Sequence, residues 1–374
     1  MDVAEYRVAL GAWLGAHEPL CATQRDVHHL ELTELAVVQR DLQHALFDAG
    51  WVRYGWPESV GGLGGDARHR ATMYDELTRR GVPVPETYLT LETLIPMLVQ
   101  FAPSAAPGFV SPLLRGDEAW CQGFSEPDAG SDLASLRTRA VRDGDEWVLN
   151  GQKVWTSQAT IAQRCVALAR TGTPESRHKG LSMFLVDHDT PGVTVRPIRA
   201  MTGRDEFGEV FFDGARVPAD RLIGDEGGGW GVAMYLLQWE RGMYPWQRQG
   251  WLHVLVDSLI EHAGVTADPG EIADAYLAVT AMRLKARQTI RRLAAGENPG
   301  PEISVDKVLL ALGDQAVTDV AERVLSPVLE LDDDGAAEGW RQEYLFGRAA
   351  PIYGGSIEIQ RSILADRVLG LPRG

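Results

Sequence analysis

The chain has 374 residues, of which 45% are hydrophobic, and a formal net charge of −16 at pH 7. This length allows a large core in two or three domains, and the negative charge disfavours binding to nucleic acids or anionic membranes. We expect neither a membrane span nor a signal peptide, because no long apolar run without charges is present. The cysteines Cys21, Cys121 and Cys165 are few and widely spaced, which predicts reduced thiols in a cytoplasmic protein.

Residues 1–118 have the sequence pattern of a helical domain. Apolar residues recur at helical intervals over Glu31–Ala49, and Gly50 is the left-handed cap expected after the last turn. A second helix is predicted over Asp66–Arg80, with its first residue as the N-cap. The proline-rich stretch 102–112 is expected to close the domain.

Residues 119–226 change to short β-type runs separated by Gly, Asp and Pro turns, which predicts a small β-barrel or sandwich. The expected strands are Glu146–Leu149, Cys165–Ala169, Ser182–Val186, Val193–Ile198 and Glu209–Phe212. Residues 227–374 are again helical in pattern. The expected helices are 230–262, 271–295, 302–329, 339–350 and a last one from Ser356. The predicted fold class is therefore α+β and multidomain.

Two polar segments in the β-region carry the strongest functional signal. Gln122–Asp132 reads Gln-Gly-Phe-Ser-Glu-Pro-Asp-Ala-Gly-Ser-Asp, and Gly151–Ser157 reads Gly-Gln-Lys-Val-Trp-Thr-Ser. The first offers free N–H groups and hydroxyls for a planar cofactor's polar rim, and the second adds an indole that can cover its ring. Taken singly, they are more often a surface turn and an ordinary strand. Together, in this order and spacing, they resemble the flavin-binding loops of the acyl-CoA dehydrogenases.

This resemblance implies FAD as the cofactor, held between the β-domain and a C-terminal four-helix bundle. The cofactor contacts that it implies are Gln122, Phe124, Ser125, Ser131, Trp155, Thr156, Ser157, Ser356 and Glu358. For Ser356, an ordinary helix N-cap is an equally good interpretation.

The catalytic base is expected at an unusual place. Ile352–Arg361 is similar to the segment that carries the catalytic carboxylate in many family members, but Gly354 stands at the matching position. A subset of the family carries the carboxylate on the first long helix of the C-terminal domain, just before an arginine. Glu240 and Arg241 match that pattern.

The local sequence favours Glu240 independently. None of its neighbours three and four positions away on a helix is basic, so the usual surface ion pair has no partner there. These neighbours are Leu236, Leu237, Met243 and Tyr244. Burial among apolar groups raises a carboxyl pKa towards the range of a general base. Gly242 and Pro245 predict a bent or thinned helix that a substrate can approach. The alternative is an ion pair between Glu240 and a distant arginine of the bundle.

The implied reaction is the α,β-dehydrogenation of an acyl-CoA thioester. Glu240 would take the α-proton and the flavin the β-hydride, while the thioester oxygen would accept hydrogen bonds from the Gly354 amide and the flavin's ribityl chain. The expected substrate contacts are Ser131, Arg241, Gly354 and Gly355. For Arg241 a structural ion pair is an equal alternative. The resemblance also implies an electron-transfer flavoprotein as the acceptor.

Two family motifs that contact a neighbouring subunit's cofactor are missing, in the stretches 259–266 and 326–340. Similar losses occur in bacterial members, including those of steroid degradation, that pair a base-bearing subunit with a second one. The chain is therefore expected to be either half of a heterotetramer with a homologous subunit or a self-sufficient homo-oligomer. The acyl chain is left open, with a bulky or steroid-derived chain among the candidates.

Other functions remain as alternatives. A non-catalytic FAD-binding subunit would explain Gly354, and an acyl-CoA oxidase would share the fold. A hydrolase is disfavoured because Gly123–Pro127 lacks the final glycine of a nucleophile elbow. No metal is expected, since the nine histidines form neither H-E-x-x-H nor a Cys/His cluster of zinc spacing.

Overall fold

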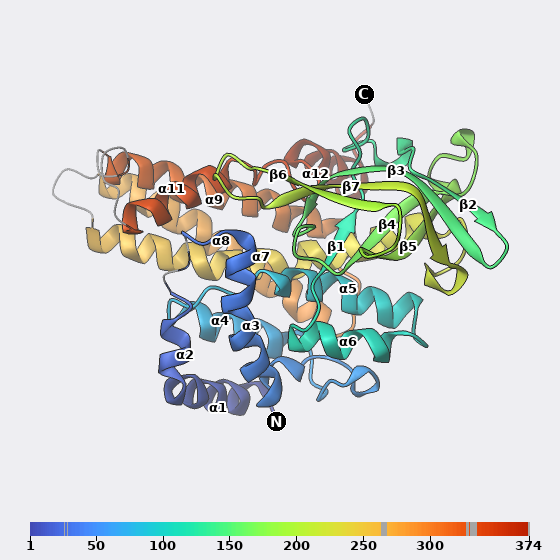
Figure 1. Cartoon of the computed structure of the whole chain (residues 1–374). Coiled ribbons are helices and arrows are strands. Elements are labelled where there is room, and N and C mark those ends of the chain that lie inside the picture. The colour runs from blue at the N-terminus through green and yellow to red at the C-terminus, as the bar shows by residue number, and fades with distance from the viewer. Residues whose placement is uncertain (26, 28, 263–267, 327–328, 330–334, 373–374) are drawn as a thin grey trace.

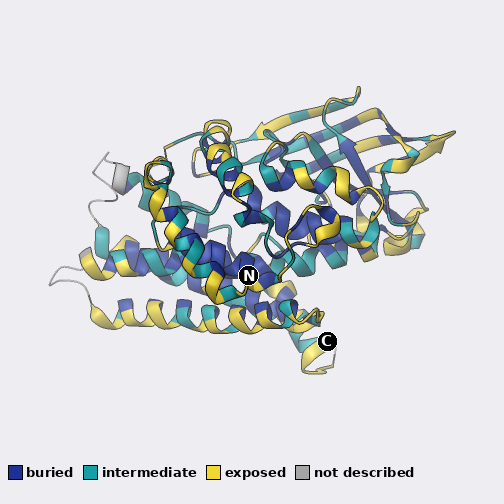
Figure 2. Cartoon of the chain, turned by 90° about the horizontal axis from the view of Figure 1, so that it is seen from below, coloured by how far each residue is buried: buried dark blue, intermediate teal, exposed yellow. Residues whose placement is uncertain are grey.

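The computed structural model describes residues 1–25, 27, 29–262, 268–326, 329 and 335–372. Helices form both ends of the chain and a β-sheet lies between them in sequence, so the predicted α+β class is confirmed (Figure 1). Buried residues concentrate where helices and sheet meet, and exposed residues follow the outer faces of the helices (Figure 2). Within the described part of the chain, no helix is long and apolar enough to cross a membrane.

The N-terminal helices are α1 (Val3–Ala16), α2 (Glu18–Ala22), α3 (Leu32–Asp48), α4 (Ala67–Thr78), α5 (Thr87–Phe101) and α6 (Ala106–Arg115). The two helices predicted there are confirmed. α3 is followed by Gly50 in the left-handed conformation, and the Asp66 carboxylate caps α4 by accepting the Arg68 N–H at 2.8 Å.

The proline-rich stretch 102–112 contributes most of α6. Pro107 lies in the first turn, where its missing N–H breaks no helical hydrogen bond. Pro112 lies inside the helix, but the helix buries Val110, Leu113 and Leu114. Burial of this apolar face outweighs the cost of the internal proline.

The sheet has eight strands in the order β6-β7-β3-β2-β4-β5-β8, and β1 pairs in parallel with β4. The strands are β1 (Trp120–Gly123), β2 (Arg139–Asp143), β3 (Glu146–Ser157), β4 (Arg164–Arg170), β5 (Leu181–Asp187), β6 (Val193–Ile198), β7 (Phe207–Pro218) and β8 (Leu222–Ile223). Each of the five predicted strands is confirmed, and β3 and β7 extend well beyond their predicted ends.

β4 and β5 are buried on both faces. One face joins the helical core, and the other packs against β3 and β7 in a separate cluster that includes Trp147 and Phe184, whose rings lie 5.3 Å apart. The sheet therefore encloses a core of its own, as the predicted barrel or sandwich requires.

The C-terminal helices are α7 (Gly229–His262), α8 (Pro269–Ala294), α9 (Ser304–Leu325), α11 (Gly335–Gly347) and α12 (Ile357–Ile363). They correspond to the predicted ones. α7 packs against α5, α8, α9 and β5, so it contacts all three parts of the molecule. This long helix carries Glu240.

Candidate active site

A bulge in β3 turns Trp155 out of the sheet. The pairing of β3 with β7 shifts register between Lys153 and Thr156, and Trp155 has a φ of 57°, which is strained for a bulky side chain. Trp155 is 61% exposed, and its ring meets the Phe207 ring in an edge-on arrangement, at 6.0 Å between centroids. The bulge thus presents a large flat surface that can lie against a planar ligand.

The two predicted polar segments lie side by side. The Val154 N–H donates to the Ser125 carbonyl at 2.9 Å, which ties the first segment to the bulged strand. Ser131 and Ser157 are exposed, and Ser125 is half-buried. A ligand can therefore reach Ser131 and Ser157 from solvent.

The side chains of three other residues of the predicted cofactor site are directed into the protein. The Gln122 side chain donates to Thr93 Oγ1 at 2.9 Å, and Phe124 is buried. The Thr156 hydroxyl is buried and, in the described part of the chain, has no hydrogen-bond partner. A hydrogen bond from Thr156 to a ligand would therefore require its side chain to rotate.

A buried ion pair that the sequence analysis missed supports this loop. Lys153 Nζ lies 2.8 Å from a Glu126 carboxylate oxygen and also donates to the Phe124 carbonyl. Glu126 accepts two more hydrogen bonds, from the backbone N–H groups of Arg137 and Thr138. Burial raises the pKa of Glu126, but the charge and hydrogen bond of Lys153 outweigh it and leave that pKa below its ordinary value.

Glu240 lies on α7 at the edge of the helical core. It is half-buried, and among the described residues its carboxylate accepts no hydrogen bond. Burial raises its pKa, although the charges of Arg241 and Lys307 partly oppose the rise. The alternative of a hydrogen-bonded ion pair with a distant arginine therefore finds no support in the described contacts.

The turn before α12 meets Glu240. Gly354 and Gly355 have φ values of 63° and 89°, a conformation that favours glycine. A Cβ atom at Gly354 would lie 2.8 Å from Glu240 Oε1. Arg241 Nε donates to the Gly354 carbonyl at 3.3 Å, so Arg241 fixes the turn. Gly354 thus forms one site with Glu240 and Arg241, from which it is separated by more than a hundred residues in the sequence.

Lys307 of α9 also belongs to this site and was missed by the sequence analysis. Its side chain is buried, donates to the Ala350 carbonyl and lies 3.9 Å from the centre of the Tyr353 ring. Burial lowers its pKa to about 8, although the neighbouring Glu240 opposes this. The available signal was its position on the same helical face as the apolar residues Leu310 and Ala311.

Gly242 lies where α7 packs closely against α8. α7 continues without interruption through Pro245. A Cβ atom at Gly242 would lie 2.9 Å from Leu293 Cδ1 of α8, so the glycine permits close packing of two helices. The approach of a substrate at this position stays a prediction.

At the start of α12, Ser356 caps the helix by accepting the Ile359 N–H at 3.4 Å, as its alternative interpretation states. Glu358 is exposed on the first turn. Their predicted contacts with FAD stay predictions. The stretches 259–266 and 326–340, where two family motifs are missing, lie partly outside the described residues.

Comparison with protein families identifies the fold. Three family models match in chain order: the acyl-CoA dehydrogenase N-terminal domain over residues 19–106, the middle domain over 121–215 and the C-terminal domain over 227–369. The chain belongs to the acyl-CoA dehydrogenase family. It is therefore an oxidoreductase acting on acyl-CoA.

Individual relatives agree. The chain is 41% identical over 387 residues to acyl-CoA dehydrogenase IpdE1 of Mycobacterium tuberculosis, covering 100% of this chain and 98% of the relative. Among solved structures it is similar to the "Tcur3481-Tcur3483 steroid ACAD", with a TM-score of 0.87, 28% identity and full coverage of both chains. It is also similar to the ChsE4-ChsE5 complex from M. tuberculosis, with a TM-score of 0.82, 26% identity and coverage of 100% and 98%.

Acyl-CoA dehydrogenases are FAD-dependent flavoproteins, and FAD is the cofactor of this family member. The residues around the bulge in β3 fit that group. Trp155 offers an exposed flat surface, and Ser125, Ser131 and Ser157 in the same two segments offer hydroxyls. An isoalloxazine ring needs this combination of an aromatic cover and polar partners at its edge.

Proposed function

We propose that the chain catalyses α,β-dehydrogenation of an acyl-CoA thioester with Glu240 as the base that removes the α-proton. One observation carries this proposal: a Cβ at Gly354 would lie 2.8 Å from Glu240 Oε1. The α7 carboxylate thus occupies the place from which a side chain at position 354 would extend. The segment 352–361 resembles the one that carries the base in many family members. A carboxylate on residue 240 and one on residue 354 would therefore reach the same place in the site.

The surroundings of Glu240 suit a base. Burial raises its pKa, and a pKa closer to the working pH makes proton transfer from a weak carbon acid less unfavourable. The charges of Arg241 and Lys307 partly oppose the rise and favour the ionised form that accepts a proton. The carboxylate has no protein hydrogen bond to give up, within the described contacts, when it takes the proton.

The turn at Gly354 suits the stabilisation of the thioester oxygen. In the described part of the chain the Gly354 N–H donates to no protein acceptor, and Arg241 holds the turn through the Gly354 carbonyl. A free N–H pointing at the oxygen would stabilise the negative charge that develops as the α-proton leaves. Bound FAD supplies the acceptor for the β-hydrogen and its electron pair.

The acyl chain that we propose is bulky, and a steroid-derived one is the first candidate. The support is the similarity to a solved enzyme titled a steroid acyl-CoA dehydrogenase. An electron-transfer flavoprotein is the proposed acceptor, as in the family that the chain belongs to.

We further propose a heterotetramer with a homologous second subunit. Two solved relatives are titled as two-component assemblies, and the sequence lacks the motifs that reach a neighbour's cofactor. Expression alone and together with a homologue tests this, with flavin per chain and mass in solution as readouts. A chain that purifies alone with one tightly held flavin per protomer would reject the heteromer.

The central experiment replaces Glu240 with Gln and adds acyl-CoA esters, including steroid-derived ones, in the absence of oxygen. We expect the flavin absorbance to bleach with the native protein and to bleach at least about 100-fold more slowly with Glu240→Gln. Glu261→Gln, an exposed carboxylate on the same helix, is the matched control and should behave as the native protein does.

The same experiment separates the alternative functions. A non-catalytic subunit would show no exchange of the α-proton with solvent on addition of any acyl-CoA. An oxidase would release one hydrogen peroxide per product once oxygen is admitted. Equal bleaching rates for the native protein and Glu240→Gln would show that the base is elsewhere.

A further inference from the structure

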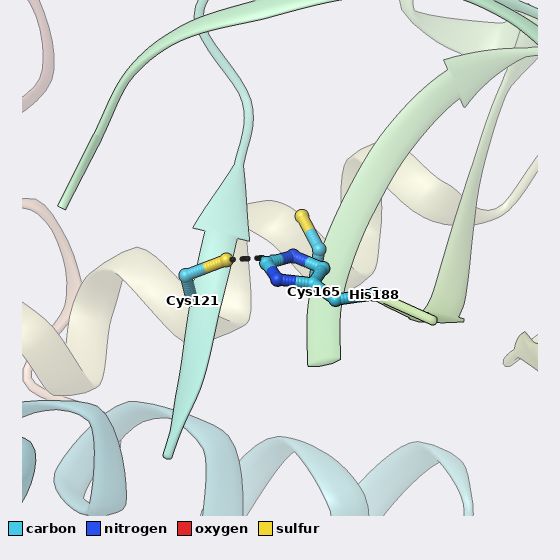
Figure 3. A group of neighbouring side chains, drawn as sticks. All are labelled: Cys121, Cys165 and His188. Carbon is cyan, nitrogen blue, oxygen red and sulfur yellow. Dashed lines mark hydrogen bonds between the residues drawn. The ribbon is translucent and has the colours of Figure 1, made fainter. Parts of the chain in front are cut away.

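A second group of reactive side chains lies inside the sheet domain, away from Glu240. Cys121 of β1 is the direct pairing partner of Cys165 of β4, and His188 follows the end of β5. The Sγ atoms of the two cysteines and one ring nitrogen of the histidine all lie within 4.8 Å of one another. Figure 3 shows the Cys121 sulfur directed at the His188 ring, at 3.6 Å from Nε2. The sequence spacing of these residues gave no sign of this cluster.

One of these distances matches that between ligands of a tetrahedral zinc ion, and the others lie close to it. With Zn–S of about 2.3 Å and Zn–N of about 2.1 Å, tetrahedral angles place sulfur and nitrogen about 3.6 Å apart and two sulfurs about 3.7 Å apart. The Cys121–His188 distance already has this value. The remaining approach is on the order of 1 Å, which a small rotation of a cysteine side chain provides.

The charges also balance. Both cysteines are fully buried in the core of the sheet domain, where an isolated charge is costly. Two thiolates, one neutral imidazole and Zn²⁺ together carry no net charge, so this unit avoids that cost. Binding releases the two thiol protons to solvent. His188 is half-buried, which leaves a route for water to the fourth position. Within the described residues, no further His, Cys, Asp or Glu belongs to the cluster.

We propose that Cys121, Cys165 and His188 bind one Zn²⁺ ion that stabilises the sheet domain. The ion would join β1, β4 and the turn after β5. The backbone N–H of His188 already donates to the carbonyl of Gln163, the residue before β4. Cys121 immediately precedes Gln122, the first residue of the predicted flavin loop. The site therefore fixes the strand from which that loop begins, and its role is structural.

The test uses the untagged full chain, purified from zinc-containing medium under reducing conditions, with metal measured by mass spectrometry. We expect about one zinc per chain in the native protein and at least a tenfold loss in Cys165→Ser and in His188→Gln. Cys21→Ser is the matched control, because Cys21 is also buried but lies in the N-terminal domain, and it should keep its zinc. His188→Gln keeps both buried thiols, so it reports on zinc even if a cysteine variant folds poorly.

A second readout is independent of activity. Removal of zinc from the native protein by a chelator should lower the melting temperature by roughly 5 °C, and added zinc sulfate should restore it. The His188→Gln variant should show neither change. Native protein that purifies without zinc and gains no thermal stability from added zinc sulfate would overturn the proposal, as would a His188→Gln variant that retains the metal. In those cases the cluster is only a set of hydrogen-bonded thiols.

Discussion

Two buried lysines lie near carboxylates in this chain, and only one of them forms an ion pair with its neighbour in the described structure. Lys153 and Glu126 form a closed ion pair at 2.8 Å, and the pKa of Glu126 falls below its ordinary value. Lys307 and Glu240 influence each other's charge without a direct hydrogen bond in the described structure, and the pKa of Glu240 rises. The difference lies in the other partners. Backbone N–H groups complete the shell of Glu126, whereas Lys307 donates to the Ala350 carbonyl instead.

The comparison indicates what distinguishes a structural carboxylate from one that can transfer a proton. A carboxylate with all its hydrogen bonds satisfied is held ionised and rigid, which suits a residue that anchors a cofactor loop. A carboxylate with a nearby but unbonded cation remains free to change its protonation state, which suits a general base.

Gly354→Glu should abolish most of the activity. The left-handed φ of 63° disfavours any side chain, and a Cβ there would displace the Glu240 carboxylate. We expect at least about a 100-fold loss in the rate of anaerobic flavin bleaching. The double variant Glu240→Gly with Gly354→Glu should recover part of that rate, because a carboxylate again reaches the same point.

Gly296→Glu is the control for backbone strain, since Gly296 has a φ of 73° but no atom within 4 Å of a Cβ. It should leave the bleaching rate unchanged. A double variant that is no more active than Gly354→Glu alone would mean that carboxylates on residues 240 and 354 do not reach the same place.

Lys153→Met should mainly reduce stability. It leaves Glu126 buried without its cation, and such broken pairs cost about 3–5 kcal/mol. The melting temperature should fall by roughly 10 °C, and flavin should dissociate more readily. Adding Glu126→Gln should restore part of this loss, because no charge is then left unpaired. A single variant as stable as the native chain would show that the pair contributes little.

The same pair predicts an acid sensitivity. The folded-state pKa of Glu126 is lowered, so its stabilising contribution is present above the ordinary value of 4.5 and is lost as the pH falls through the lower folded value. The native melting temperature should therefore drop in this window. In the double variant Lys153→Met with Glu126→Gln this component should disappear, which thermal scans at stepwise lower pH would measure.

How much of this could be read from the sequence depends on the range of the contacts. Periodicity and capping residues act locally, so α3, α4 and the main strands were predicted well. The roles of the flavin-loop motif and of Glu240 are predictions that rest on the resemblance of whole segments to a family. The position of Lys307 over Tyr353 and the packing of Gly242 on Leu293 arise from segments far apart in sequence, and no local pattern encodes them.

Lys307→Met should shift the pH dependence of the reaction. Loss of the cation removes a charge that lowers the pKa of Glu240, so that pKa should rise and the acid limb of the kcat/KM profile should move to higher pH, by on the order of one unit. The native profile should also show a change near pH 8, where Lys307 loses its proton, and the variant should lack it. Lys179→Met, which removes an exposed lysine, controls for net charge. An unchanged acid limb would remove Lys307 from the site's electrostatics.

Trp155→Gly should have the smallest effect on stability and a selective effect on the cofactor. The side chain is 61% exposed, and glycine relieves the strain of a φ of 57°, so the melting temperature of the flavin-free protein should change by no more than about 3 °C. The flavin should bind at least about fivefold more weakly, because the indole no longer covers the ring. Fluorescence titration of the flavin-free protein with FAD measures this, and Trp13→Phe serves as an aromatic control in the N-terminal helices. Unchanged FAD affinity would show that the indole does not cover the flavin. Trp155 would then act as the Lys153–Glu126 ion pair does, by supporting the site without touching the ligand.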